Sequence, residues 1–393
     1  MQKKLFNATY WLLSFVNLIT ALGLSMVSTI VSSYAVSLGA GLTLAGTLAG
    51  VFSVAALIIR PFSGMAMDVM NKRNICIFST LLICVSFLGY TFASNITVML
   101  FFRILHGLAF GISGTANMAL ISECIPKERL GEGLGYFGMG QIIAQICGPN
   151  IGIAIKNHYG YHALFFGISI FTVLAVGILF LVQYNKTEHQ TTSERKFKFH
   201  LGNLVVKECI VYALTAGLFS LGNGIVNSFL VLLGEERGIS NIGLFFSMNA
   251  AVLLVMRLLI GRVVDKSGLS LIVNLSLLVT AVSMFLIGSS AGILLILVAA
   301  VFKAVGQGGG QIALQSACIK KVDVKKVGIA TSTYYIGADI GQGFGPILGG
   351  KISSLFNYQT MFYHIAVLML VGAVFFSIYQ VRNRKKEVNI SAV

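Results

Sequence analysis

Long apolar runs dominate this 393-residue chain. Each run approaches the roughly 20 residues that a helix needs to cross a bilayer. Over the whole chain 56% of residues are apolar and 10% are charged, whereas soluble domains carry about 25% charged residues. The chain is therefore predicted to be an all-α integral membrane protein with twelve transmembrane helices. We expect these helices near residues 10–32, 43–67, 74–93, 98–120, 134–155, 163–183, 208–233, 241–262, 269–289, 292–316, 327–351 and 361–380.

The long polar segment in the middle of the chain is too polar to span a membrane. It predicts an N-terminal six-helix bundle at 1–183, a cytoplasmic linker at 184–206, a C-terminal bundle at 207–381 and a cytoplasmic tail at 382–393. With the N-terminus inside, most of the 28 lysine and arginine residues fall on the cytoplasmic side, as the positive-inside rule requires. The net charge of +15 is thus assigned to topology, and no nucleic-acid partner is expected. The six cysteines form no CxxC pair, so no metal site is expected either.

Two patterns recur at a common offset of 197 residues. The polar pattern consists of Arg60, Gly64 and Asp68, with counterparts Arg257, Gly261 and Asp265. The Gly-Pro pattern consists of Gly148, Pro149 and Gly152, with counterparts Gly345, Pro346 and Gly349. A shared offset predicts two halves that are parallel copies, which in transporters places the substrate site near the bilayer midplane between them.

These motifs resemble those of the major facilitator superfamily, and in particular the bacterial drug:proton antiporters. Its signature of a glycine, an aspartate and a basic cluster is similar to Gly64, Asp68, Lys72 and Arg73. Its antiporter motif is similar to the Gly-Pro pattern, which the second copy extends to Gly350. The resemblance implies a monomeric, multi-pass protein of the bacterial cytoplasmic membrane. It implies alternating access driven by the proton gradient, with no cofactor and no enzymatic activity.

The repeated motifs have two readings each. The basic and acidic residues of the first pattern, with Lys72 and Arg73, are expected to form a cytoplasmic latch between the halves. The alternative is a solvated turn that obeys the positive-inside rule. The Gly-Pro helices are expected to bend or pack tightly at the interface between the halves, and the alternative is ordinary packing glycines.

Two cations lie deep in predicted spans, Arg103 and Lys303, and Asp339 is the one deep acid. A charge at this depth costs about 2.5 to 3.5 kcal/mol on insertion scales, so such groups are usually functional. We expect Asp339 and Lys303 to approach each other as a proton-coupling pair, with a static ion pair as the alternative. Arg103 is expected to bond backbone carbonyls near Pro149 or an anionic substrate group. His106 is a further coupling candidate, and a packed histidine is the alternative.

Neutral amides supply the other polar groups inside the spans, and they are expected to line a cavity or lie between helices. Such a lining suits a neutral or weakly charged amphipathic solute, exported as a drug or metabolite. The alternative is a proton-linked importer or facilitator of a sugar, amino acid or organic anion. The lining candidates are Asn17, Asn117, Gln141, Gln145, Asn223, Asn227, Asn249, Gln307, Gln311, Gln315 and Gln342.

Overall fold

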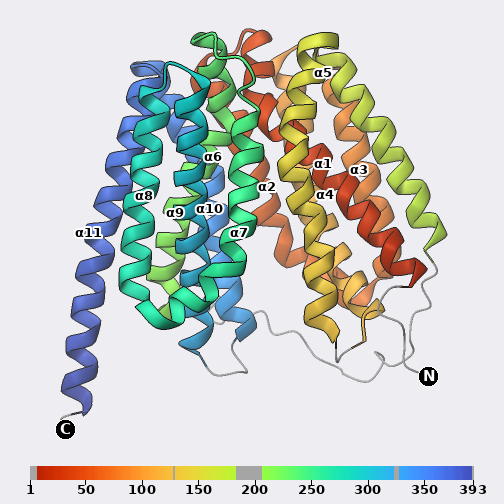
Figure 1. Cartoon of the computed structure of the whole chain (residues 1–393). Helices are drawn as coiled ribbons and strands as arrows, with labels where there is room; N and C mark the ends of the chain where they lie inside the picture. The colour runs from red at the N-terminus through yellow and green to blue at the C-terminus, as the bar shows by residue number, and fades with distance from the viewer. Residues whose placement is uncertain (1–6, 127–128, 183–205, 323–326, 392–393) are drawn as a thin grey trace. The chain divides into compact units, whose positions relative to one another are not determined.

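The computed structural model describes residues 7–126, 129–182, 206–322 and 327–391 (Figure 1). This part of the chain is built from α-helices and one short 3₁₀ helix, Lys207–Cys209, and it contains no β-strand. The helices are α1 (Ala8–Ser37), α2 (Leu42–Val69), α3 (Lys72–Phe92), α4 (Ile96–Cys124), α5 (Leu130–Leu181), α6 (Ile210–Glu236), α7 (Leu244–Ser267), α8 (Leu269–Ser289), α9 (Ile293–Lys320), α10 (Val327–Leu355) and α11 (Tyr358–Ser391). The all-helical prediction is confirmed. The predicted linker lies almost wholly outside the described residues, and α11 continues into the segment predicted as a tail.

Asparagine side chains fix where several helices begin. The Oδ1 atom of Asn7 accepts a hydrogen bond from the Tyr10 amide at 2.7 Å. Asn95 accepts from Val98 at 2.9 Å in the same way. An asparagine at this position satisfies one of the amide groups that the first turn leaves without a partner. Each asparagine stands just before a long apolar run, so the local sequence sets the start of α1 and of α4.

One glycine divides the longest helix. Gly160 has a φ of 84° and a ψ of 176° inside α5, and glycine reaches positive φ without the steric cost of a side chain. The backbone before and after it is helical, so α5 comprises two helical segments. They correspond to the predicted spans 134–155 and 163–183.

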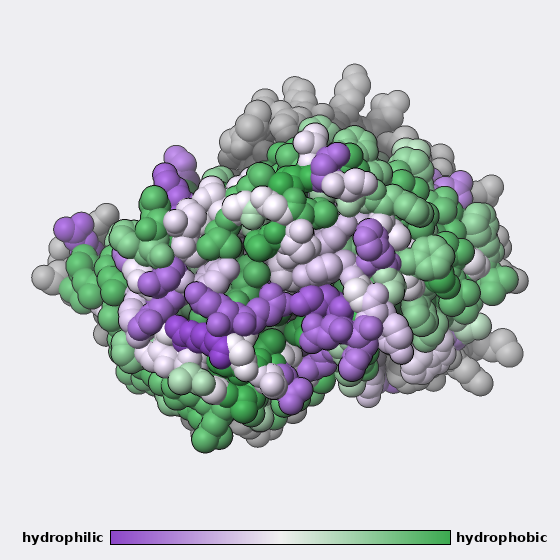
Figure 2. Space-filling view, turned by 90° about the horizontal axis from the view of Figure 1, so that it is seen from above, coloured by the Kyte–Doolittle hydropathy of each residue, from purple (hydrophilic) through white to green (hydrophobic). Residues whose placement is uncertain are grey.

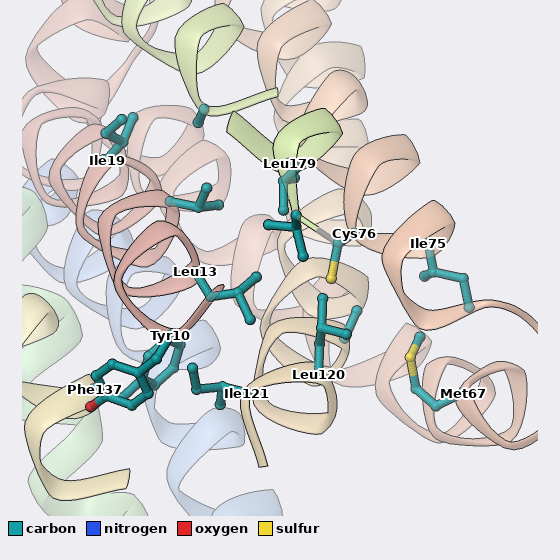
Figure 3. Close-up of a cluster of buried hydrophobic side chains, with 14 of the residues drawn as sticks. Tyr10, Leu13, Ile19, Met67, Ile75, Cys76, Leu120, Ile121, Phe137 and Leu179 are labelled. Carbon is teal, nitrogen blue, oxygen red and sulfur yellow. The ribbon is translucent and has the colours of Figure 1, made fainter. Parts of the chain in front are cut away.

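The helices group into two compact units. Unit 1 contains residues 1–40 and 51–199, and unit 2 contains residues 41–50 and 200–393. In unit 1 an apolar cluster joins all five helices, with Leu13 of α1, Met67 of α2, Cys76 of α3, Leu120 of α4 and Leu179 of α5 among its members (Figure 3). Burial of these side chains holds the helices of unit 1 together.

Equivalent helix pairs pack closely in the two units. In unit 1, a Cβ atom on Gly148 of α5 would lie 2.7 Å from the Ser25 Cβ atom of α1. In unit 2, a Cβ atom on Gly345 of α10 would lie 2.4 Å from the Leu221 carbonyl oxygen of α6. Gly345 follows Gly148 by the 197 residues of the sequence repeat. The repeat therefore preserves a glycine at one helix contact, because a side chain there would separate the two backbones.

The composition of the helices fits a bilayer. Nine helices of the described chain, all except α7 and α10, contain stretches long and apolar enough to cross a membrane, and α7 contributes the shorter apolar stretch Leu244–Arg257. On α8, Leu271, Leu275, Leu278 and Phe285 are all exposed and form a stripe at helical spacing. Figure 2 shows hydrophobic residues, in green, over much of the surface in this view, with hydrophilic residues, in purple, gathered among them. A large exposed apolar surface of this kind is stable against lipid.

Candidate functional site

A lysine is enclosed inside unit 2. Lys303 of α9 is 2% exposed. Its ammonium donates to Asn223 Oδ1 at 2.8 Å, to Gln307 Oε1 at 2.8 Å and to Asn249 Oδ1 at 3.5 Å. These three residues are called the amide cluster below. They come from α6, α9 and α7, respectively (Figure 1). Three donors of the ammonium thus meet three neutral acceptors.

The amide groups around the lysine continue into a directed chain. Asn223 Nδ2 donates to Gln342 Oε1 of α10 at 3.1 Å. Gln307 Nε2 donates to Gln311 Oε1 at 3.3 Å, and Gln311 Nε2 donates to Ser220 Oγ of α6 at 3.2 Å. Each bond runs away from the lysine. The charge therefore polarises a network that joins α6, α9 and α10.

The lysine's partners differ from the expected one. Lys303 was predicted to approach Asp339, but in the described residues its ammonium bonds only to the amide cluster. Asp339 lies half-buried on α10. Three residues further along α10, Gln342 is the side chain that joins the network. A separation of three residues turns the side-chain direction by about 60° around a helix, and depth in the span does not fix that angle.

Arg103 and His106 share an aromatic pocket in unit 1. The guanidinium carbon of Arg103 lies 4.5 Å from the ring centroid of Phe52, in a cation–π contact. The ring of His106 lies 4.9 Å from Phe52 and 4.8 Å from Phe87, and its Nδ1 atom is 3.2 Å from Tyr90 Oη. His106 is 1% exposed. These contacts are those of a packed histidine, the alternative considered from the sequence.

The other lining candidates divide between buried and exposed positions. Asn17 Nδ2 donates to the Phe137 carbonyl at 3.2 Å and joins α1 to α5. Asn117 is 4% exposed, and its Nδ2 atom donates to Ser113 Oγ at 3.3 Å. Asn227 is half-buried on α6, whereas Gln141 and Gln145 are exposed on α5.

Basic residues of the predicted latch find partners within unit 1. Lys72 forms an ion pair with Glu123 of α4. Arg73 Nε and Nη2 donate to the carbonyls of Leu179 and Phe180 at 3.1 and 2.6 Å. These carbonyls end α5, where a cation also interacts favourably with the helix dipole.

The remaining residues of that polar pattern lie on α2 and α7. Arg60 and Gly64 are half-buried and Arg257 is exposed. Asp68 lies on α2, and Gly261 and Asp265 lie on α7, where the structure describes their backbone alone.

The Gly-Pro motifs place their glycines against neighbouring helices. In α5, Cβ atoms on Gly148 and Gly152 would meet α1, while the backbone at Pro149 remains helical. In α10, Gly345 faces α6, and Gly349 lies close to Ile225 of α6 and Met361 of α11. Pro346 and Gly350 lie against the start of α2, within residues 41–50 of unit 2. The close contacts therefore serve packing inside each unit.

Several partners were not anticipated from the sequence. Ser220, Tyr90 and Phe52 each complete a polar or aromatic contact described above. Ser220 had a readable signal, because it precedes Asn223 by three residues and so shares its face of α6. Tyr90 and Phe52 had none, since an aromatic residue in an apolar run has the same local pattern whether it faces lipid or a histidine.

Apolar helices around buried polar networks define a polytopic membrane protein. The chain belongs to the Major Facilitator Superfamily, whose family model matches residues 13–240 and 212–393. It is a membrane transporter, and its relatives and structural neighbours are transporters rather than enzymes.

Curated relatives match most of the chain. The multidrug resistance efflux pump PmrA of Streptococcus pneumoniae is 23% identical over 92% of this chain and 93% of its own length. The multidrug resistance protein MdtG of Salmonella arizonae is 26% identical over 83% of both chains. An uncharacterized MFS-type transporter of Methanocaldococcus jannaschii is 23% identical over 92% of this chain and 94% of its own.

Solved structures share the fold. The nucleoside transporter NupG superposes with a TM-score of 0.79 at 13% identity, over 94% of this chain and 98% of its own. A POT family transporter in complex with 5-aminolevulinic acid gives a TM-score of 0.80 at 15% identity, over 97% and 98% of the two chains. At these identities the similarity concerns the fold.

Proposed function

We propose that this transporter exports a small organic compound across the bacterial cytoplasmic membrane in exchange for protons. The chain acts as a monomer, with both termini in the cytoplasm. The names of PmrA and MdtG support the direction and the class of cargo. The observation that carries proton coupling is Lys303, a buried cation bonded by neutral amides.

A buried ammonium without a bonded carboxylate has a low cost of losing its proton. Taking a charge out of water is expensive, and neutral acceptors offset less of that cost than a carboxylate does. When the hydration of the site changes, the balance between the charged and neutral forms of the lysine changes with it. Lys303 is therefore the residue that exchanges the proton. Asp339 is the second candidate, and the enclosed His106 is assigned to packing.

The test uses inverted membrane vesicles, in which the lumen corresponds to the cell exterior. An acidic lumen should drive accumulation of fluorescent compounds from a drug panel, and nigericin should abolish it. Lys303→Met should reduce this accumulation at least about tenfold, because methionine cannot exchange a proton. A tenfold loss corresponds to about 1.4 kcal/mol of lost coupling. Exchange of labelled for unlabelled compound should continue in this variant.

Controls separate the alternatives. Accumulation that requires an alkaline lumen would identify the importer. If Lys303→Met retains gradient-driven accumulation and Asp339→Asn loses it, Asp339 rather than Lys303 is the coupling residue. Lys320→Gln on the same helix, where the lysine is exposed, should behave as the unaltered protein.

A further inference from the structure

The three oxygens around Lys303 form a receptor for one protonated amine. Asn223 and Gln307 each accept at 2.8 Å, and Asn249 accepts at 3.5 Å. All three act on a single nitrogen. The residues of the amide cluster are half-buried, while Lys303 is almost fully buried. The residues that carry the acceptors are therefore less buried than the lysine that now occupies them.

The direction of the amide groups determines which ligand suits the site. An anion would need N–H donors at the centre of the cluster. The Nδ2 atom of Asn223 and the Nε2 atom of Gln307 point outward instead, toward Gln342 and Gln311. The centre is thus lined by carbonyl oxygens, which hydrogen-bond a cationic N–H donor more strongly than a neutral one.

We infer that the amide cluster binds the protonated primary amine of the transported compound after Lys303 has released its proton. This inference rests on the proposed function and names its substrate class, an amphipathic primary amine. Lys303 changes from –NH₃⁺ to –NH₂ and the proton leaves to water, so no other reactant is needed. The neutral Nζ atom then offers a lone pair to the incoming ammonium. Substrate and proton compete because the three oxygens hold one ammonium at a time.

Other charged groups near α9 are accounted for in the test. Within the described residues, the helices packed against α9 carry Asp339, Lys351, Tyr334 and Tyr335 on α10, Tyr212, Glu235 and Glu236 on α6 and Arg257 on α7, and α8 carries none. None of these groups bonds the Lys303 ammonium there. Asp339→Asn is included to separate the acid on α10 from the lysine.

The experiment measures equilibrium binding to the full-length protein in detergent, without any gradient. Four probes carry the same fluorophore on a butyl chain that ends in a primary ammonium, a trimethylammonium, a hydroxyl or a carboxylate. Fluorescence anisotropy is followed across pH. The primary ammonium should bind best, and its affinity should rise by about tenfold per pH unit while Lys303 is charged, because one proton is displaced. The trimethylammonium probe should bind at least about tenfold more weakly, since it has no N–H donor.

Variants assign the effect to the site. Lys303→Met should bind the ammonium probe with no pH dependence, and replacing a buried charge by an apolar side chain of similar size is often tolerated. Asn249→Ala should weaken binding without removing the pH dependence. Its matched control, Asn274→Ala on α8, changes a half-buried asparagine that donates to Ser270 Oγ at 3.4 Å, outside the cluster, and should bind normally. Asp339→Asn should retain the pH slope.

The outcomes are distinct. Preference for the carboxylate probe, equal binding of both cations, or a slope that survives Lys303→Met would each overturn the inference. Competition in detergent without gradient-driven export in vesicles would contradict the proposed function alone. Gradient-driven export with no preference among the four probes would contradict only the substrate class.

Discussion

At the scale of single residues, Asn223 has two roles in one side chain. Its oxygen accepts from Lys303 and its nitrogen donates to Gln342. Removing Asn223 would take one acceptor from the buried Lys303 ammonium and one donor from the oxygen of the half-buried Gln342. Each such loss has a larger effect on stability than the bond itself contributes.

Asn223→Ala should lower the free energy of unfolding by about 1 to 3 kcal/mol, because the Lys303 ammonium loses an acceptor in a buried site. Asn227→Ala, one turn along α6, should have a smaller effect. Thermal unfolding of both variants in the same detergent measures the difference. Equal midpoints for the two variants would show that the bond to Lys303 does not contribute to stability.

At the scale of helices, glycines set how near α6 and α10 approach. A Cβ atom on Gly341 would lie 2.0 Å from the Gly217 carbonyl oxygen, and one on Gly337 would lie 2.2 Å from the Ala213 carbonyl. These glycines recur every four residues and so lie along one face of α10. The approach of the two helices is thus limited by backbone atoms, and it holds Gln342 within reach of Asn223.

Gly341→Ala should destabilise the protein by about 1 to 3 kcal/mol, because the new methyl group must push α6 and α10 apart. Gly177→Ala in α5 is the matched control, since a Cβ atom there meets nothing within 4 Å. That control should be neutral or slightly stabilising, as alanine has the higher helix propensity. Detergent-solubilised yield and unfolding midpoint report both effects, and a loss of similar size in the two variants would contradict the close contact.

Hydropathy predicts where the helices lie more completely than it predicts which side chains bond to each other. The span expected at 269–289 coincides with α8, because an apolar run ends where polar or glycine residues allow the backbone to turn. Four amides were expected inside the protein, because a polar side chain that faces lipid is energetically costly. They are Asn223, Gln307, Gln311 and Gln342. Their bonds to Lys303 were not predictable, because they depend on the rotation of each helix and on the rotamer of a long side chain.

At the scale of the whole molecule, the uneven distribution of lysine and arginine predicts which side of the membrane each loop occupies. Tags at both termini should bind antibody only after permeabilisation of the cells. A tag inserted after Gly238, between α6 and α7, should be labelled on intact spheroplasts. Labelling of either terminus before permeabilisation would reverse the predicted orientation.

The convergence of three oxygens on one nitrogen also has an electrical consequence. If the amide cluster holds either the lysine's ammonium or the substrate's, each direction of the cycle carries one positive charge across the bilayer. The exchange is then electroneutral, although a single uncompensated charge would gain or lose about 2.3 kcal/mol per 100 mV. Such a pump would draw on the pH difference alone and would continue to work in a cell whose membrane voltage has collapsed.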